Sequence, residues 1–159
     1  MFFYVSSTQQ STNGTANTDT LLAAIQTVAA SHRARCVRLQ GGCYLSPTDN
    51  QYRLRLGFLT TVGTYAAGTA ITPKPNPPDG TAANVTASSL PTLGTGVFGA
   101  VPNVSLAANL RNGFLWVALS DDEKIEMVGA GPALNATLVL NSQATVASVP
   151  VTFAITHSE

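Results

Sequence analysis

Charged side chains are scarce in this sequence of 159 residues. Asp, Glu, Lys and Arg make up 10% of the chain, whereas a soluble domain carries roughly 25%. Eight basic and eight acidic residues give a net charge of zero, so no net field attracts nucleic acid or an anionic membrane. A free monomer with so little charge tends to self-associate. The composition favours an assembly protein whose surface is covered by neighbouring subunits, without nucleic-acid or membrane partners.

Histidine is also rare, and this argues against catalysis. The two histidines are His32 and His157, and we expect His157 to lie in a frayed C-terminal end. A hydrolase triad needs a histidine base between a nucleophile and an acid, and a closed zinc site needs about four His or Cys ligands. Neither GxxxxGK[ST] nor a strand–GxGxxG–helix pattern occurs. We therefore expect no enzymatic activity and no cofactor.

The cysteines leave two alternatives open. Cys36 and Cys43 are seven positions apart, with Gly41 and Gly42 between them. A tight hairpin at the two glycines would bring the sulfur atoms close enough to bond. The alternative that we favour is a pair of buried thiols in a reducing cytoplasm.

Long apolar runs are absent. No window approaches 18 apolar residues, so the sequence predicts no transmembrane helix. The start, MFFYVSSTQQ, has no basic segment and no apolar run of the length that a signal peptide needs. We expect the chain to be made and kept in the cytoplasm, unless a particle carries it out.

What the sequence does contain is typical of many short β-strands. It has 20 Thr, 13 Gly and nine Pro, a combination that suits pleated strands separated by frequent turns. The clearest strand is 52–58, where Leu54, Leu56 and Phe58 share one face and Arg53 and Arg55 share the other. Further strands are expected at 35–39 (with Val37 and Leu39 on one face), 83–87, 114–119, 124–128, 136–140 and 149–155.

This pattern predicts an all-β fold, a jelly-roll-like antiparallel β-sandwich at residues 21–159. Residues 1–20 open with Phe2, Phe3 and Tyr4 and continue as a polar stretch, which predicts an extended N-terminal arm. Residues 21–28 suit either a short helix, which we prefer, or a strand.

A long Pro-rich loop occupies residues 72–80. Because proline fixes φ and lacks an N–H, this stretch is not expected inside a sheet and should run extended over the surface. We predict that the arm and the loop clamp neighbouring subunits. The candidate interface residues are Phe2, Phe3, Tyr4, Arg53, Arg55, Pro73, Lys74, Pro75, Pro77 and Pro78.

Five arginines lie within 23 residues, at positions 33, 35, 38, 53 and 55. If the two strands that carry them pair, their guanidinium groups form one basic stripe. Without interleaved aromatic residues, protein partners or a solvated face are favoured over nucleic acid.

Part of the sequence resembles structural proteins of tailed bacteriophages and prophages. Residues 68–75 have the sequence Gly-Thr-Ala-Ile-Thr-Pro-Lys-Pro, and a Pro- and Ala-rich stretch follows to position 83. An arginine-containing strand precedes this turn, and an aromatic strand, an acidic turn and a closing β pair follow it. The resemblance covers residues 34–159.

The resemblance implies a virion structural protein, a jelly-roll decoration or cement protein that stabilises the shell of major capsid protein. It also implies assembly as a homotrimer on the capsid surface, after synthesis in the bacterial cytoplasm. It carries over no catalytic residues.

A carbohydrate- or receptor-binding module of a tail fibre or tail tip is the alternative function. Its candidate residues are Trp116 and the acidic group Asp121, Asp122 and Glu123. We expect Trp116 to lie in the core and these acidic residues, with Glu126 nearby, to form a solvated turn rather than a calcium or glycosidase site.

Overall fold

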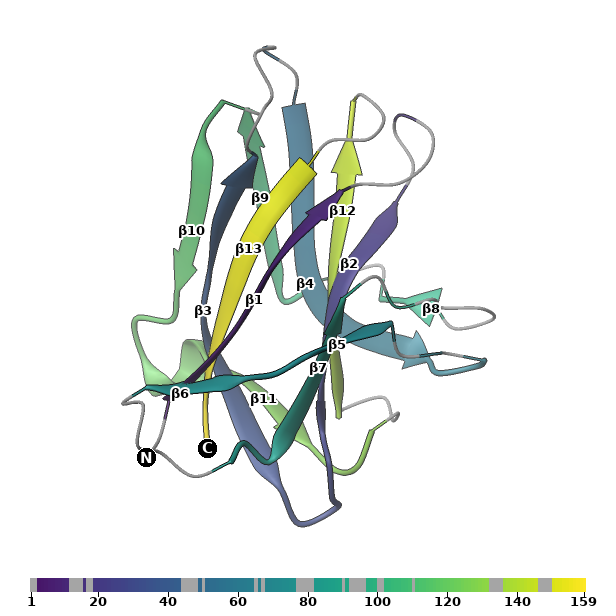
Figure 1. The fold of residues 1–159 in the computed structure, drawn as a ribbon, viewed down its shortest axis with the longest axis vertical. Coiled ribbons are helices and arrows are strands. Elements are labelled where there is room, and N and C mark those ends of the chain that lie inside the picture. The colour runs from purple at the N-terminus through teal and green to yellow at the C-terminus, as the bar shows by residue number, and fades with distance from the viewer. Residues whose placement is uncertain are drawn as a thin grey trace.

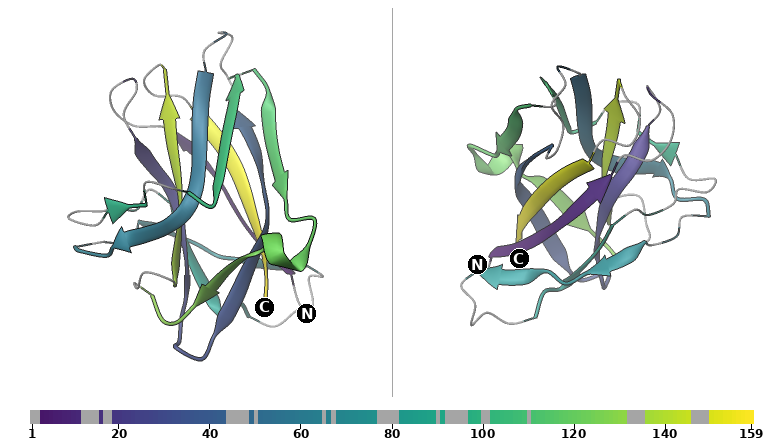
Figure 2. Two further views of the ribbon diagram at one scale, coloured as in Figure 1. Left: turned by 180° about the vertical axis from the view of Figure 1, so that it is seen from behind. Right: turned by 45° about the horizontal axis from the view of Figure 1, so that its top comes forward.

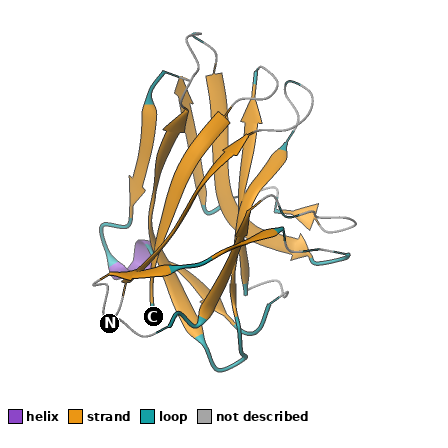
Figure 3. Ribbon diagram, in the orientation of Figure 1, coloured by secondary structure: helices purple, strands orange, loops and turns teal. Residues whose placement is uncertain are grey.

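The chain folds into two packed antiparallel β-sheets, and almost every element in the computed structural model is a strand (Figures 1 and 3). Among the described residues, the single helical element is η1 (Asp121–Glu123), one turn of 3-10 helix. The structure describes residues 3–11, 16, 19–43, 49, 51–64, 66, 68–76, 82–89, 91, 97–99, 102–109, 111–131, 136–145 and 150–159.

Each sheet has a continuous order of strands. The first sheet is β10 (Gly113–Val117), β3 (Arg33–Cys43), β13 (Pro150–Ser158), β1 (Phe3–Ser11) and β6 (Lys74–Asn76), and β11 (Ile125–Val128) also pairs with β3. The second sheet is β5 (Thr69–Ile71), β7 (Val85–Ser89), β2 (Thr20–Thr27), β12 (Thr137–Ala144), β4 (Gln51–Thr61) and β8 (Val97–Phe98), and β9 (Val104–Asn109) also pairs with β4.

The connectivity is that of a jelly roll. One sheet contains β10, β3, β13 and β1 in that order, and the other contains β2, β12, β4 and β9. When these eight strands are followed in chain order, most successive strands lie in opposite sheets. This is the pattern of the two Greek keys that make up a jelly roll. The remaining strands extend the sheet edges. The all-β sandwich predicted from the sequence is confirmed.

Apolar side chains from both sheets fill the interior. In β4, Leu54 and Leu56 are buried and Arg53 is exposed, which confirms the predicted alternation. Each fully buried side chain of this size contributes about 1.5–3 kcal/mol. The largest buried side chains are Phe153, Leu22, Ile25, Leu39, Leu54, Leu56, Leu59, Met127, Leu138 and Leu140.

Residues 20–27 form a strand, so the preferred helix was wrong. β2 is paired with β12 on one side and with β7 on the other. Its four consecutive residues 22–25 are all buried. Ala23 and Ile25 face the core, whereas Ala24 packs with Leu59 and Val139 on the opposite face of the sheet. Leu22 also joins the core, because a bulge leaves it without a partner in β12. A strand covered on both faces has a continuous apolar run, which the sequence does not distinguish from a short helix.

Residues 3–11 belong to the sandwich and do not form an arm outside it. β1 lies between β13 and β6, with Tyr4 opposite His157 on one side and opposite Pro75 on the other. Its polar sequence does not prevent this, since hydrogen bonds of the backbone hold a strand that is paired at both edges. The domain therefore includes β1 as well as residues 21–159.

The start of the Pro-rich segment runs extended, as predicted, but it also joins a sheet. β6 is a strand of three residues at the edge of the first sheet, and Pro75 lies within it. An edge strand tolerates proline because one side of its backbone has no partner. Residues 77–80 lie outside the described part of the chain.

The proposed hairpin at Gly41 and Gly42 was wrong. β3 continues through both glycines, which pair with β10 on one side and with β13 on the other. At about 3.3 Å per residue, the Cα atoms of Cys36 and Cys43 are about 23 Å apart along this strand, whereas a disulfide requires about 7 Å or less. Cys36 is a free, buried thiol.

Candidate functional site and interaction surfaces

The N-terminal residues and the Pro-rich segment meet at one edge of the first sheet. Phe3 lies opposite Asn76, Tyr4 opposite Pro75, and Val5 opposite Lys74. The two segments expected to clamp neighbours therefore pair with each other. Pro73 and Pro75 are half-buried and Lys74 is exposed. Phe2, Pro77, Pro78 and the side chains of Phe3 and Tyr4 lie outside what the structure describes.

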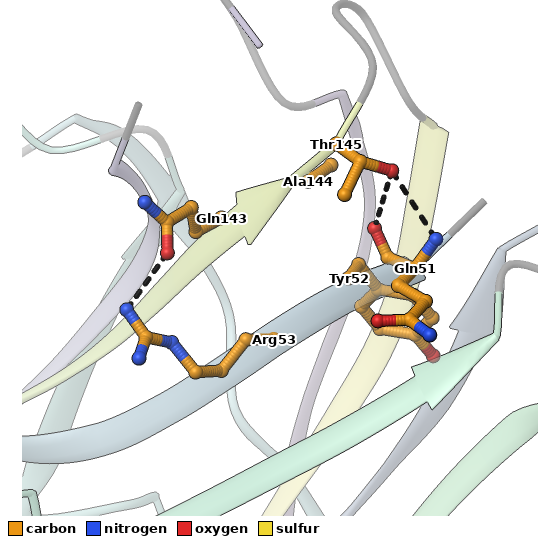
Figure 4. A pocket seen from close by; sticks show the side chains of 6 residues that line it. All are labelled: Gln51, Tyr52, Arg53, Gln143, Ala144 and Thr145. Atoms are coloured by element: carbon orange, nitrogen blue, oxygen red, sulfur yellow. Dashed lines mark hydrogen bonds between the residues drawn. The ribbon is translucent and has the colours of Figure 1, made fainter. Parts of the chain in front are cut away.

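Arg53 and Arg55 lie elsewhere, on the outer face of the second sheet. Arg53 Nη2 donates a hydrogen bond to Gln143 Oε1 at 2.7 Å (Figure 4). Arg55 forms an ion pair with Asp19, and its guanidinium carbon lies 5.0 Å from the centroid of the Phe98 ring. Both arginines bind neighbours within the chain, and Arg55 keeps only 14% of its side chain exposed.

The basic stripe does not form. The strands β3 and β4 that carry the five arginines belong to different sheets, since a jelly roll sends consecutive strands to opposite sides of the sandwich. Arg33 and Arg35 each lie 3.5 Å from the carboxylate of Glu126. The arginine-rich sequence is thereby divided between two faces.

A small hollow of about 200 Å³ lies at the end of β4 and β12 (Figure 4). Its polar groups bind one another: Thr145 Oγ1 donates to the Gln51 carbonyl oxygen at 3.1 Å and accepts from the Gln51 N–H at 3.2 Å. It contains no acid, histidine or thiol that could do chemistry. The lining residues are Gln51, Tyr52, Arg53, Gln143, Ala144 and Thr145.

The outer face of β10 carries an uncovered row of apolar side chains. Leu115 is 58% exposed, Val117 40% and Leu119, just beyond the strand, 87%. Phe114 and Trp116 alternate with them and point inward. The sequence had a signal for this surface, because every residue from 114 to 119 is apolar and a half-buried strand should alternate with polar residues. Within this segment, we predict a buried position from the sequence for Trp116 alone.

A shallow hollow of about 410 Å³ adjoins this row on the outer face of the first sheet. Val5, Val37 and Val117 contribute apolar surface, and Arg38, Gln40 and Asn76 contribute polar groups. The row and the hollow form one continuous surface across β10, β3 and β1. We call it the β10 face.

The third feature is a cleft of about 490 Å³, lined by residues of β4, β10 and the η1–β11 segment. Figure 2 (left) shows β9 beside β10, and β10 leading into η1 and β11. We call it the Trp116 cleft. It is lined by Phe58, Asn103, Trp116, Asp122, Glu123, Lys124, Ile125 and Glu126. Trp116 packs against the core, as expected, but it is only partly buried.

The acidic turn beside this cleft is exposed. Asp121 forms an ion pair with Lys124, and the hydrogen bond from Lys124 and its positive charge lower the pKa of the Asp121 carboxyl. Glu123 Oε2 accepts a hydrogen bond from the Leu119 N–H at 2.7 Å. Within the described ranges, no three His, Cys, Asp or Glu side chains are grouped so that they could hold a metal ion.

His157 is not in a frayed end. It lies in β13, is completely buried, and has its Nε2 atom 3.6 Å from Glu159 Oε1. Burial lowers the pKa of its imidazole to about 4 because the charged form loses its hydration. A side chain without exposed surface does not reach a substrate, so the location of His157 gives no support to catalysis.

Comparison with known proteins adds no relative. No protein-family model matches the chain, and no curated protein is similar to it in sequence. No helix among the described residues has the length and apolar character needed to cross a membrane.

Proposed function

We propose that the chain is a non-enzymatic structural protein of a bacteriophage particle, a decoration protein that binds and stabilises the assembled shell of major capsid protein. The observation that carries this proposal is the β10 face. Its three uncovered apolar side chains, Leu115, Val117 and Leu119, follow one another at alternate positions. Large exposed apolar patches mark interaction sites in soluble proteins.

The position of β10 strengthens the argument. β10 stands at the end of the strand order of the first sheet, and its sequence Gly-Phe-Leu-Trp-Val contains no charge and no proline. Proteins normally protect such an edge with charged residues, proline or a covering segment. An edge strand without charged residues or proline is suited to permanent cover by another subunit.

Composition supports the same conclusion. Zero net charge and 10% charged residues give weak protection against association, so the protein gains solubility when its apolar face is buried. The jelly roll itself is compatible with many functions. The assignment to a phage particle rests on the resemblance of residues 34–159, and it places the protein on the capsid surface after synthesis in the bacterial cytoplasm.

We further propose a homotrimer in contact with the major capsid protein. A closed, symmetric trimer buries equivalent patches three times, and a stable contact buries about 1,200–2,000 Å² in total. The N-terminal and Pro-rich segments contribute to this contact through Val5 and Asn76, which line the hollow of the β10 face, although their strands pair with each other at the far edge of the sheet.

A double substitution tests the proposal. Leu115→Ser with Leu119→Ser removes apolar contacts from the β10 face without changing the core. The matched control is Val97→Ser, which changes a side chain that is 51% exposed in the second sheet. Each purified protein is added to capsids that lack it, and bound copies and heat resistance of the capsid are measured.

We expect the double variant to lose at least tenfold in occupancy and most of the added heat resistance, and the control to match the wild type. Equal occupancy for all three proteins would reject the β10 face as the contact. Failure of the wild-type protein to bind shells, together with its absence from purified particles, would reject the function itself.

A further inference from the structure

We infer that the Trp116 cleft is a binding site for a neutral sugar of one or two rings. This inference goes beyond the proposed decoration function. It rests on the cleft of about 490 Å³, on two aromatic side chains from opposite sheets, and on the polar groups at its rim. The cleft adjoins the β10 face, because Lys124 lines both hollows.

The two aromatic residues lie at the border of the packed interior and line the cleft. Phe58 follows Leu54 and Leu56 on the inward face of β4, but unlike them it is only partly buried. Likewise, Trp116 follows Phe114 on the inward face of β10, but Phe114 is buried and Trp116 is only partly buried. Beyond Val117 the strand β10 ends and η1 leads into β11, and residues of these segments line the cleft together with Phe58.

Two rim groups remain for a ligand. The carboxylates of Asp121 and Glu123 are occupied by Lys124 and by the Leu119 N–H. The side chains of Asp122 and Asn103 make neither an ion pair nor a hydrogen bond to the described part of the chain, and both line the cleft. An ionised carboxylate accepts hydrogen bonds, whereas an amide both donates and accepts.

This combination matches the surface of a sugar ring. A pyranose presents C–H groups on its face, which pack against an aromatic ring, and hydroxyl groups around its rim, which need both donors and acceptors. The volume lies within the range of about 300–1,000 Å³ that is usual for small-molecule sites.

Other ligand classes fit less well. The carboxylates of Asp122, Glu123 and Glu126 line the cleft and oppose an anion. Glu126 is held by Arg33 and Arg35, and Glu123 accepts from the Leu119 N–H, so Asp122 is the carboxylate left to attract a cation, and Lys124 lies beside it. A wholly apolar ligand would leave these polar groups without hydrogen-bond partners, which is costly.

The chain provides its own reporter, since Trp116 is its only tryptophan. Intrinsic fluorescence of the full-length protein is therefore titrated with maltose, lactose, cellobiose and N,N′-diacetylchitobiose. We expect a saturable change in emission with at least one of them. Asp122→Ala and Asn103→Ala should each raise the Kd at least tenfold, because each removes a hydrogen-bonding group from the rim.

Asp49→Ala is the matched control, because it removes an exposed carboxylate far from the cleft, in the connection between β3 and β4. It should bind with the wild-type Kd. The absence of a saturable change with all four sugars would overturn the inference, and so would equal Kd values for Asp122→Ala and Asp49→Ala. A response to a lysine-rich peptide but to none of the sugars would assign the cleft to a cationic protein segment instead.

The outcome is independent of the decoration function. Asp122→Ala should leave capsid occupancy unchanged, since Asp122 belongs neither to the exposed row nor to the hollow of the β10 face, which shares only Lys124 with the cleft. Loss of sugar binding with normal occupancy supports both proposals, whereas loss of occupancy in this variant would place the cleft in the shell contact and overturn the sugar site.

Discussion

His157 of β13 lies directly opposite Cys36 of β3, and neither side chain has exposed surface. The next pair in the register is Thr156 with Arg38, so Val37 has no partner in β13 and forms a bulge in β3. A bulge shifts the alternation by one residue. Cys36 and Leu39 therefore both face the core, and Val37 faces the outer hollow instead of sharing the face of Leu39.

The buried imidazole makes stability depend on pH. In the unfolded chain histidine has a pKa of about 6.5, whereas burial lowers the pKa of His157 to about 4. Between these values the unfolded state binds the proton and the folded state does not. Stability should therefore be constant above pH 6.5, fall by about 3 kcal/mol in all as the pH drops to 4, and then level off.

NMR titration of the His157 ring gives its pKa directly, and urea unfolding between pH 7.5 and 4 gives the change in free energy. His157→Gln removes this group, so its stability should fall less steeply over the same range. A midpoint of 6 or above for the ring would contradict the buried, neutral histidine.

The Cys36 thiol should be inert in the folded protein. Burial raises its pKa to about 12, so almost no thiolate is present near neutral pH, and the thiolate is the reactive form. In a Cys43→Ser variant we expect no reaction with a thiol reagent at pH 8 over an hour, and complete reaction in guanidinium chloride. Fast labelling of the native variant would show that Cys36 is accessible.

Gly41 should not tolerate a larger side chain. A Cβ atom at this position would lie 2.1 Å from the Thr152 carbonyl oxygen and 2.7 Å from Phe114 Cζ. Because the backbone oxygen cannot move away within a paired sheet, Gly41→Ala should lower the free energy of unfolding by about 1–3 kcal/mol.

Gly42→Ala is the control for this substitution, since its nearest contact would be 3.3 Å. Urea unfolding should show a clearly smaller loss of unfolding free energy for Gly42→Ala than for Gly41→Ala. Equal losses for the two variants would mean that steric overlap at position 41 is relieved by movement of the strands.

Removal of β1 should prevent folding. β1 pairs with β13 along its whole length and with β6 at its start, so a chain without residues 1–11 exposes the edge of β13 and loses the partner of β6. We expect such a chain to show no cooperative thermal transition by circular dichroism. A chain without residues 1 and 2 keeps β1 complete and should melt like the wild type; a stable fold of residues 12–159 would instead restore the idea of a separate arm.

The local pattern in the sequence was sufficient to predict the strands that have one buried face and one exposed face. The alternation in 52–58 predicted which side chains of β4 are buried, because one face meets the core and the other meets solvent. Proline predicted that residues 72–80 run extended and outside the interior of a sheet, since its missing N–H excludes a central strand; the described residues of β6 are extended, at a sheet edge. These inferences require only the geometry of a single strand.

Pairing between distant segments decided the remaining features. β2 is a strand because β7 and β12 flank it, and β1 is ordered because β13 pairs with it. The same crossovers separate Arg38 from Arg53 and bury His157 near the end of the chain. Nothing local to these residues specifies their partners.

The candidate sites were likewise predictable only in part from the sequence. The apolar segment 114–119 and the acidic residues after it were visible in the sequence. Only the tertiary structure showed that Leu115 and Val117 face outward while Trp116 faces a cleft that it shares with Phe58 of the other sheet. By itself, the sequence determined a strand-forming chain with few charges, zero net charge and defined turns. The tertiary structure decided which faces remain uncovered, because burial depends on neighbours that long-range strand pairing brings together.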